Sequence, residues 1–548
     1  MNATPTTITH LPLRPLLIAL LAAAWLLPGL IGHDPWKPDE AYTFGVVHEI
    51  LRGGSWVIPH IAGEPFLDKP PLFHLTAAAS TVALSWLLPT HDAARIAAGL
   101  WIGLAFVFAA LASRELHGPR HGLTAALLLL GCLGLVVRGH QLITDVAAFC
   151  GFAMAYYGAA LALRRAAPAG FWIGTGCGIG FMTLGVPEAV MIALIALLLP
   201  LSPHWRTPRY AAALITAVVA ALPWLVIWPA LLHQRDPALY AAWLNAENLA
   251  RFFATPDLIS GLAYYLRILP WYAFPAWPLA AWALWRAYRG SRLADPGMVL
   301  PLTGFVVTLL LLGSAAETRE LYGLPMLLPL ALLAVPGVDA LRRGAVNGWY
   351  WFSIMTFTFF IAIGWFYWSA LELGMPARLH GHLHTIRPGY DFGFRPLPFL
   401  LGLVYTAGWF VLLSRLKRSA ERPLIVWTTG VTAVWALLAT LFIGWVDISK
   451  SYRSMMTDLG RALPAKQHCL ASRDLGEAQR AMLQYFSGIR TERVETSARA
   501  AGCDLLLVQG RPLDELVIGS EWRQIWEGHR PGDKDERFRL YQRTAKTR

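Results

Sequence analysis

Apolar runs of roughly 20 residues recur along most of this chain, and they constrain its fold more than any other feature. A run of that length is what an α-helix needs to cross the hydrocarbon core of a bilayer. Composition agrees, because 56% of the 548 residues are hydrophobic and only 15% are charged. The sequence therefore predicts a mainly α, polytopic membrane protein and excludes a soluble globular one.

Thirteen runs can be placed as membrane spans. The first follows Arg14 and has small residues at 22–24, which is also typical of a cleavable signal peptide. Because the run continues past those residues, we prefer an uncleaved first helix. The predicted spans cover residues 11–31, 93–113, 121–138, 145–163, 171–185, 188–201, 209–231, 262–285, 297–313, 321–340, 348–371, 396–414 and 424–445.

One further apolar run, at 72–88, has two interpretations. If it crossed the membrane, the next basic loop would lie outside and every later span would be inverted. Its Pro-rich flanks favour a juxtamembrane helix lying at the outer surface. We therefore expect it to belong to the first outer loop.

The loops between the spans separate by charge into two sets. Cytoplasmic loops carry an excess of Lys and Arg, so the Arg-rich set, which includes the pairs 114/120, 164/165 and 342/343, is assigned to the cytoplasm. The longer, aromatic loops at 32–92, 232–261, 314–320 and 372–395 are assigned to the outside. An odd number of spans then places the N-terminus in the cytoplasm and the C-terminal segment outside.

The net charge of +12 follows largely from the Arg residues that fix this orientation. The chain has no basic stripe with interleaved aromatic residues of the kind that nucleic acid binding requires. We therefore expect membrane lipids, and no nucleic acid, among its partners.

The last 102 residues differ from the rest in composition. Residues 447–548 hold 18 Lys and Arg and 14 Asp and Glu, whereas the preceding 446 residues hold 48 charged residues. Short apolar segments at 468–472, 504–509, 522–526 and 538–541, with a helical pattern at 477–486, predict a small α/β domain. We therefore divide the chain into a membrane domain, 1–446, and a water-soluble domain, 447–548.

Two cysteines, Cys469 and Cys503, fall in the water-soluble domain. In an oxidising compartment they would form either a disulfide or two free thiols, and the sequence leaves both open.

The first outer loop carries residues suited to chemistry on a phosphorylated lipid. Asp39 and Glu40 follow Pro38 at a predicted helix start, and a carboxylate fixed there is a candidate general base. Lys69 stands between Asp68 and two prolines, which would aim its ammonium at a phosphate. The alternatives are a solvated helix cap for the acidic pair and a headgroup-seeking lysine.

Other outer segments add ionisable candidates. Asp145 begins a predicted span and follows Arg138 and His140, and an ionisable residue at membrane depth is a functional candidate by default. Two further outer loops carry Arg251, and Arg319 with Tyr322. Cations from several loops on one face suit an anionic ligand.

These residues resemble a known family. The stretch P-D-E…G-G-S-W-V-I-P-H-I-A-G…F-L-D-K-P, from residue 38 to residue 70, is similar to the first outer loop of bacterial 4-amino-4-deoxy-L-arabinose lipid A transferases. The wider group includes protein O-mannosyltransferases. Weaker similarities are T-D at 144–145, N-L-A-R-F-F at 248–253 and R-E-L-Y-G-L-P at 319–325. The resemblance implies a GT-C fold with juxtamembrane helices in the first outer loop, and a polyprenyl-phosphate sugar as donor.

The resemblance also implies roles for the matching residues. Asp39 would be the catalytic carboxylate and Asp145 a second acidic residue near the site. Lys69 and Arg251 would hold the donor phosphate, and Tyr322 would line the same cavity. The remaining candidates for catalysis or substrate binding are Glu40, Arg319, Arg138, His140 and Tyr42.

Three departures leave the sugar and acceptor open. Tyr42 and Thr43 stand where the arabinose transferases have Arg-Tyr, and Leu184 precedes Gly185 where they have Lys. Asp68 replaces the usual Glu.

We therefore expect an inverting glycosyltransferase of the bacterial inner membrane with a periplasmic active site. It would move a sugar from polyprenyl phosphate to lipid A or a related phosphoglycolipid, or else to a protein or another glycan. A lipid flippase and a non-catalytic receptor are the alternatives from other classes. Nothing demands a cofactor, although Asp39, Asp145 and Asp68 are candidates to hold Mg²⁺ or Mn²⁺ beside a phosphate.

Overall fold

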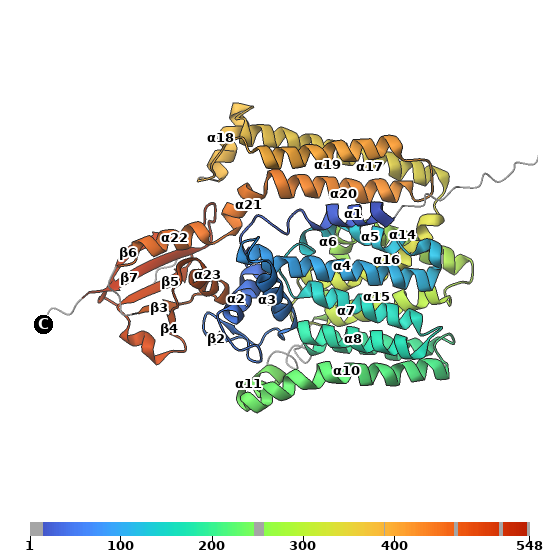
Figure 1. Ribbon diagram of the computed structural model, residues 1–548, viewed down its shortest axis with the longest axis horizontal. Coiled ribbons are helices and arrows are strands. Elements are labelled where there is room, and N and C mark those ends of the chain that lie inside the picture. The colour runs from blue at the N-terminus through green and yellow to red at the C-terminus, as the bar shows by residue number, and fades with distance from the viewer. Residues whose placement is uncertain (1–14, 246–256, 388, 465–468, 514–518, 545–548) are drawn as a thin grey trace, which may run out of the picture.

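The computed structural model describes residues 15–245, 257–387, 389–464, 469–513 and 519–544. Long helices lie side by side over most of the molecule, and the five-stranded sheet lies beyond one end of them (Figure 1). The helices that correspond to the apolar runs of the sequence are α1 (Pro15–Leu26), α4 (Thr90–His117), α5 (Thr124–Gly131), α6 (Leu133–Arg138), α7 (Asp145–Leu161), α8 (Ala166–Leu184), α9 (Val186–Leu198), α10 (Pro208–Arg235), α13 (Leu258–Tyr272), α14 (Ala276–Arg289), α15 (Pro296–Gly313), α16 (Leu324–Asp339), α17 (Arg343–Glu372), α19 (Pro396–Arg415) and α20 (Arg422–Leu441).

Each predicted span coincides with one or two of these helices. Within the described residues, seven helical segments are long and apolar enough to cross a membrane by length and composition, and several others are shorter. The predicted span at 262–285 is divided into α13 and α14 around Pro275, and the span at 121–138 is divided at Cys132. Pro275 lacks a backbone N–H, so it cannot continue the hydrogen-bond ladder of α13.

The first outer loop folds into short elements at one end of these helices. They are α2 (Asp39–Leu51), the paired strands β1 (His60–Ile61) and β2 (Glu64–Pro65), and α3 (Leu72–Leu84). The 13 residues of α3 rise roughly 20 Å, which is less than the thickness of the hydrocarbon core. This length agrees with a juxtamembrane helix at 72–88.

The remaining short helices connect larger elements. They are α11 (Pro237–Ala242), α18 (Ala377–Ile386), α21 (Ile443–Lys450) and the 3₁₀ turns Pro119–His121, Leu199–Leu201, Glu320–Gly323 and Ala498–Gly502. Helix α21 leads from α20 into the C-terminal domain (Figure 1).

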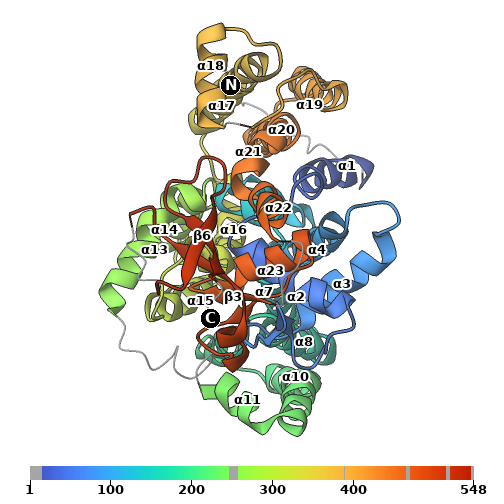
Figure 2. The same ribbon diagram turned by 90° about the vertical axis from the view of Figure 1, so that its left-hand side faces the viewer.

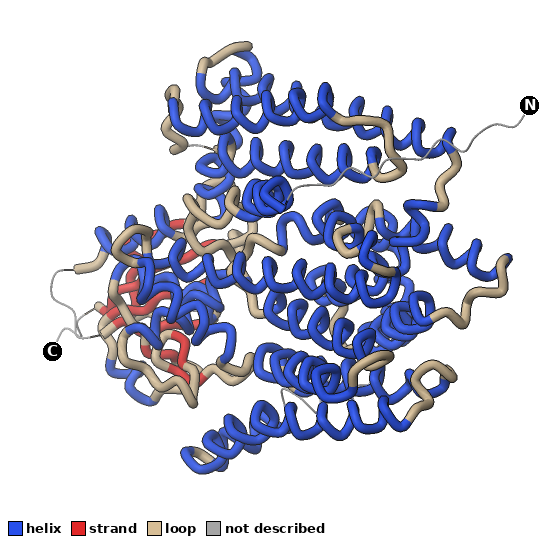
Figure 3. The backbone as a smooth tube through the Cα atoms, turned by 45° about the vertical axis from the view of Figure 1, so that its right-hand side comes forward, coloured by secondary structure: helices blue, strands red, loops and turns tan. Residues whose placement is uncertain are grey.

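The C-terminal domain is a small α/β unit, as the sequence predicts. Its strands gather at one end of the molecule (Figure 3) in the order β4-β3-β5-β7-β6, with β3 parallel to β4 and β5, and the other pairs antiparallel. Cys469 and Cys503 form a disulfide, which resolves the choice that the sequence left open. The elements are α22 (Arg453–Ala462), β3 (Leu470–Arg473), α23 (Glu477–Ser487), β4 (Glu492–Arg493), β5 (Leu505–Gly510), β6 (Trp522–Gly528) and β7 (Arg537–Arg543).

This domain packs directly on the first outer loop. Helix α23 lies against α2, and a Cβ on Gly45 would come within 2.6 Å of the Ala481 Cβ. Ion pairs join the surfaces, among them Arg490 to Glu49 at 2.9 Å and Arg493 to Glu64 at 3.0 Å. Viewed from the end, the domain covers α2 and α7 (Figure 2). The first outer loop is therefore held between the long helices and the sheet.

Candidate active site

Two adjoining cavities lie where the first outer loop meets α7 and the loop before α16. One has a volume of about 500 Å³ and a polar lining, and the other has a volume of about 220 Å³ and a mainly apolar lining. Both are lined by the same four ionisable residues, Lys69, Asp145, Glu317 and Tyr322. These four side chains therefore lie at the boundary between a polar and an apolar space.

Asp39 faces the polar cavity from the first turn of α2. Its Oδ1 accepts a hydrogen bond from Arg319 Nη2 at 2.9 Å, and the Arg319 guanidinium lies 5.6 Å from the centre of the Tyr322 ring. A carboxylate in the first turn of a helix is favoured by the helix dipole. The structure thus brings together Asp39, Arg319 and Tyr322, which the sequence singled out in separate segments.

Lys69 lies in the segment between β2 and α3 and lines both cavities. Burial alone would lower its pKa, but the nearby Asp145 and Asp68 carboxylates raise it above the ordinary value. Burial, together with the Lys69 charge, lowers the pKa of His74 to about 4. Lys69 is therefore the cation at the boundary of the two cavities, and His74 beside it is neutral.

Asp145 begins α7 and is 7% exposed. It lies at the end of a segment whose residues Ile143 and Thr144 also line the polar cavity. Tyr42 lines this cavity as well, and burial with the neighbouring Glu477 and Asp39 raises its pKa. Five carboxyl groups and two cations line the polar cavity in total: Asp39, Asp68, Asp145, Glu317, Glu477, Lys69 and Arg319.

Three of the sequence candidates lie outside both cavity linings. Glu40 is 1% exposed and accepts hydrogen bonds from Arg95 and from the backbone N–H of Leu142 and Trp36. It points away from Asp39 because successive helical side chains project about 100° apart.

Arg138 and His140 are the other two. Arg138 Nη1 donates to Gln141 Oε1, and the buried His140 ring packs between Trp25 and Trp435, with Nε2 2.7 Å from the Trp25 carbonyl. The structure therefore gives Glu40, Arg138 and His140 places in the framework, not on the cavity surface. Arg251 lies outside the described residues.

Glu317 and Glu477 line the polar cavity without having been singled out from the sequence. Glu317 stands only two residues before Arg319, so the neighbouring sequence could have indicated that Glu317 lies near the polar cavity. Glu477 begins α23 in the C-terminal domain, 438 positions after Asp39. No sequence pattern reveals that it would reach this cavity.

The acidic residues of the site do not form a metal cluster. Across the described part of the chain, no three His, Cys, Asp or Glu side chains are grouped closely enough to hold a metal ion. Asp39 is instead paired with Arg319, and Asp145 lies near Lys69. The site therefore offers the Lys69 and Arg319 cations to an anionic ligand.

Comparison with known proteins agrees with this architecture. The sequence model of the dolichyl-phosphate-mannose-protein mannosyltransferase family matches residues 68–228. An undecaprenyl phosphate-α-4-amino-4-deoxy-L-arabinose arabinosyl transferase of Pseudomonas savastanoi pv. phaseolicola is 28% identical over 78% of this chain and 76% of its own. A protein of that name from Pseudomonas fluorescens Pf-5 is 27% identical over 78% of this chain and 71% of its own.

The fold is also that of a solved structure. ArnT from Cupriavidus metallidurans bound to undecaprenyl phosphate superposes with a TM-score of 0.69 at 15% identity, covering 96% of this chain and 97% of that one. Its apo form superposes with a TM-score of 0.68. The chain therefore has the GT-C fold of these membrane proteins, and the curated relatives it matches are glycosyltransferases. The shared fold extends through the C-terminal domain, because the superposition covers almost the whole chain.

Proposed function

We propose that this glycosyltransferase moves a sugar, 4-amino-4-deoxy-L-arabinose in the first instance, from undecaprenyl or another polyprenyl phosphate to lipid A or a related acceptor. The names of the relatives support this donor and this sugar. The observation that carries the proposal is the pair of cavities that meet at Lys69. A polyprenyl-phosphate sugar has an apolar tail, an anionic phosphate and a polar sugar in that order.

The donor fits the two cavities in one direction. The start of the polyprenyl chain would occupy the apolar cavity beside Met191 and Leu312, and the sugar would occupy the polar cavity beside Asp39 and Tyr42. The phosphate between them would then contact Lys69. A cation placed there stabilises the charge that develops on the phosphate as it leaves, which is the largest electrostatic contribution expected in such a transfer.

The chemistry is a displacement at the anomeric carbon with inversion. An acceptor oxygen attacks from the polar cavity, its bond to the anomeric carbon forms, and the bond to the phosphate oxygen breaks. Asp39 takes the proton of a hydroxyl acceptor, or orients a phosphate acceptor that is already ionised. Arg319 holds the Asp39 carboxylate through their 2.9 Å hydrogen bond, and Asp145 faces the same space.

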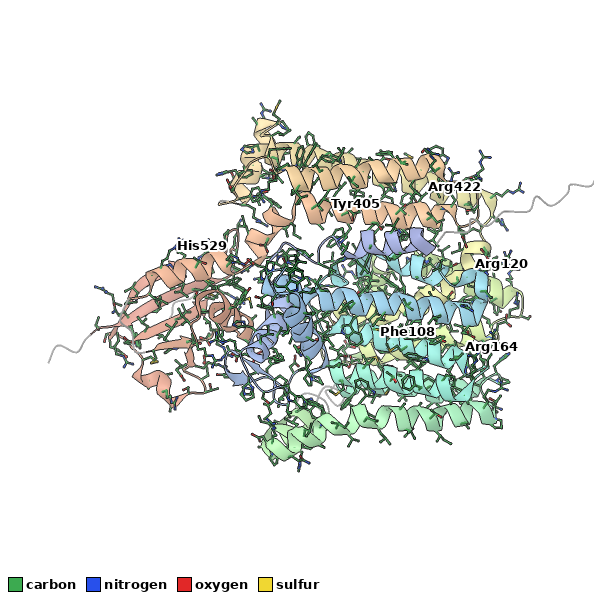
Figure 4. The ribbon with its side chains drawn as sticks, viewed as in Figure 1. Phe108, Arg120, Arg164, Tyr405, Arg422 and His529 are labelled. Carbon is green, nitrogen blue, oxygen red and sulfur yellow. A yellow bond between two sulfur atoms is a disulfide. The ribbon has the colours of Figure 1, made fainter. Side chains whose placement is uncertain are left out.

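The proposed orientation places the active site and the C-terminal domain in the periplasm, with the membrane domain ending at residue 446. Arg120, Arg164 and Arg422 lie at one end of the long helices, and His529 lies in the sheet domain beyond the other end (Figure 4). The Arg-rich end suits the cytoplasm. The Cys469–Cys503 disulfide suits an oxidising compartment such as the periplasm.

Asp39→Asn tests the proposal. The purified wild type is incubated with bacterial lipid extract that contains polyprenyl-phosphate sugars, and mass spectrometry follows glycosylated acceptors and free polyprenyl phosphate. Because Asn cannot accept a proton, we expect transfer to fall at least about 100-fold, in the range of general-base losses. Asp458→Asn, which changes an exposed carboxyl group of the C-terminal domain, is the matched control.

The outcomes separate the candidate functions. Glycosylated protein or glycan in place of lipid A would change the acceptor. Equal transfer by Asp39→Asn and wild type would remove Asp39 as the base. Lipid movement between leaflets without any glycosylated product would instead favour a flippase.

A further inference from the structure

Glu40 connects the segments that carry Asp39 and Asp145, two of the five carboxyl groups that line the polar cavity. It follows Asp39 directly, at the start of α2, and its Oε1 accepts a hydrogen bond of 2.9 Å from the backbone N–H of Leu142. Leu142 is completely buried and stands three residues before Asp145. The Glu40 carboxylate thus holds the segment of Asp145 against the helix start of Asp39.

The other contacts of Glu40 fix its own position. Arg95 Nε donates to the same Oε1 at 2.9 Å, and the backbone N–H of Trp36 donates to Oε2 at 3.1 Å. Burial would raise the pKa of Glu40, but Arg95 and the neighbouring hydrogen bonds keep it below the ordinary value. The carboxylate therefore stays ionised and accepts hydrogen bonds from Arg95 and from the backbone N–H groups of Trp36 and Leu142.

Arg95 extends the framework to the chain that precedes α2. Its guanidinium is 0% exposed, pairs with Asp92 at 2.7 Å and donates to the backbone carbonyls of Leu30, His33 and Asp34. Since Arg95 and Asp92 both belong to α4, the long helix is the fixed base of the arrangement. Arg95 also keeps one anionic partner, Asp92, when the Glu40 charge is removed.

We propose that Glu40 is a positioning residue, which sets the placement of Asp39 relative to Asp145 through its hydrogen bond to the Leu142 amide. The inference rests on the proposed function. Glu40 does not touch the substrate in this arrangement, because it lines neither cavity. Its effect is on the alignment of the carboxylates during transfer, and donor binding at Lys69 is independent of it.

Two substitutions separate this role from a general contribution to folding. Glu40→Gln keeps an amide oxygen that can accept from the Leu142 N–H, whereas Glu40→Met has similar volume and no acceptor. We expect Glu40→Met to lower kcat about 100-fold, with the donor KM and the affinity for undecaprenyl phosphate within about 3-fold of wild type, because a small misplacement of catalytic groups costs that much. Glu40→Gln should retain kcat within about 10-fold.

Arg95→Lys provides a second variant on the other side of the contact. Lys keeps a cation for Asp92, but a single nitrogen cannot also serve Glu40 and three carbonyl oxygens. We expect a loss in kcat, again without a matching change in KM. This variant tests the inference even where Glu40→Met folds poorly in thermal unfolding.

Hydrogen exchange gives a readout that does not depend on transfer. Exchange at the amides of residues 140–145, followed by mass spectrometry, should accelerate at least about 10-fold in Glu40→Met and change little in Glu40→Gln. Unchanged exchange in Glu40→Met would overturn the inference, whether or not the proposed reaction is observed. Equal kcat losses in Glu40→Gln and Glu40→Met with unchanged exchange would also overturn it, and would assign the Glu40 charge to the chemistry itself.

Discussion

The surroundings of Lys69 fix the position and the charge of the residue proposed to bind the donor phosphate. It lines both cavities, and Asp145 and Asp68 raise its pKa against the effect of burial. A group whose charged form is favoured in this way stays cationic across the range in which enzymes work. The prolines at 70 and 71 follow it directly and restrict the backbone there.

Removing the Lys69 charge should weaken the donor interaction. We expect Lys69→Met to lower kcat/KM by about 10- to 100-fold, since a charge-assisted hydrogen bond contributes about 1.5–3 kcal/mol. Steady-state kinetics with a purified polyprenyl-phosphate sugar would measure the loss, and binding of undecaprenyl phosphate would locate it. Lys69→Arg keeps the charge and is the control. Wild-type affinity for undecaprenyl phosphate in Lys69→Met would contradict a phosphate contact here.

Helix α21 holds the first outer loop from the side of the C-terminal domain. Asp447 Oδ1 accepts from the backbone N–H of Asp34 at 3.0 Å and from Trp36 Nε1 at 2.8 Å. Burial and the neighbouring Asp34 raise the pKa of Asp447 to about 7. Burial also acts on Asp34, but the hydrogen bond from Arg453 holds its pKa below the ordinary value. The proton of this pair therefore resides on Asp447.

This assignment predicts a pH-dependent stability. The folded state binds a proton at Asp447 up to about pH 7, whereas the unfolded chain loses it near pH 4. The contribution of Asp447 to the free energy of unfolding is therefore at its maximum below about pH 4 and is lost as the pH rises to about 7. Asp447→Asn keeps an oxygen for both donors and removes the titration. Its stability relative to wild type should rise over this range, by at most about 4 kcal/mol.

Thermal unfolding of the detergent-solubilised protein at pH 5 and pH 8 would measure this difference. Asp458→Asn, at an exposed position on α22, is the control that should show no such trend. A difference in Tm between Asp447→Asn and wild type that is the same at both pH values would contradict the raised pKa.

At the scale of the whole molecule, the basic residues are distributed unequally between the two ends of the long helices. Arg120, Arg164 and Arg422 lie at the end of the long helices opposite the sheet domain (Figure 4), whereas the polar cavity lies where the sheet domain meets the first outer loop. Glu477 from the C-terminal domain completes the lining of the polar cavity. The domain is therefore part of the site and not an appendage.

Labelling with a membrane-impermeant maleimide would test the orientation of the molecule. His529→Cys, on the exposed surface of the sheet domain, should react in spheroplasts without lysis. Arg164→Cys, at the opposite end, should react only after the membrane is opened (Figure 4). The parent protein controls for its free cysteines, Cys132, Cys150 and Cys177. The reverse pattern would invert the proposed topology.

Local features of the sequence were sufficient to predict the helical membrane architecture, the α/β unit in the last hundred residues, and the segments that carry Asp39, Lys69, Asp145, Arg319 and Tyr322. These follow from local properties: apolar length, charge bias, strand patterning and a motif in one loop. Hydrophobic periodicity and composition are properties of neighbouring residues, so they can be recognised in a sequence without knowing which segments pack together.

Which of the ionisable residues share a surface depends on the three-dimensional fold. Glu40 and Asp39 are adjacent in sequence, yet the helix directs Glu40 towards the buried Arg95 and Asp39 towards the polar cavity. His140 is likewise packed between two tryptophan rings, and Glu477 arrives from a separate domain. These positions depend on contacts between residues far apart in the chain, and the hydrophobic pattern of a single sequence does not indicate such contacts.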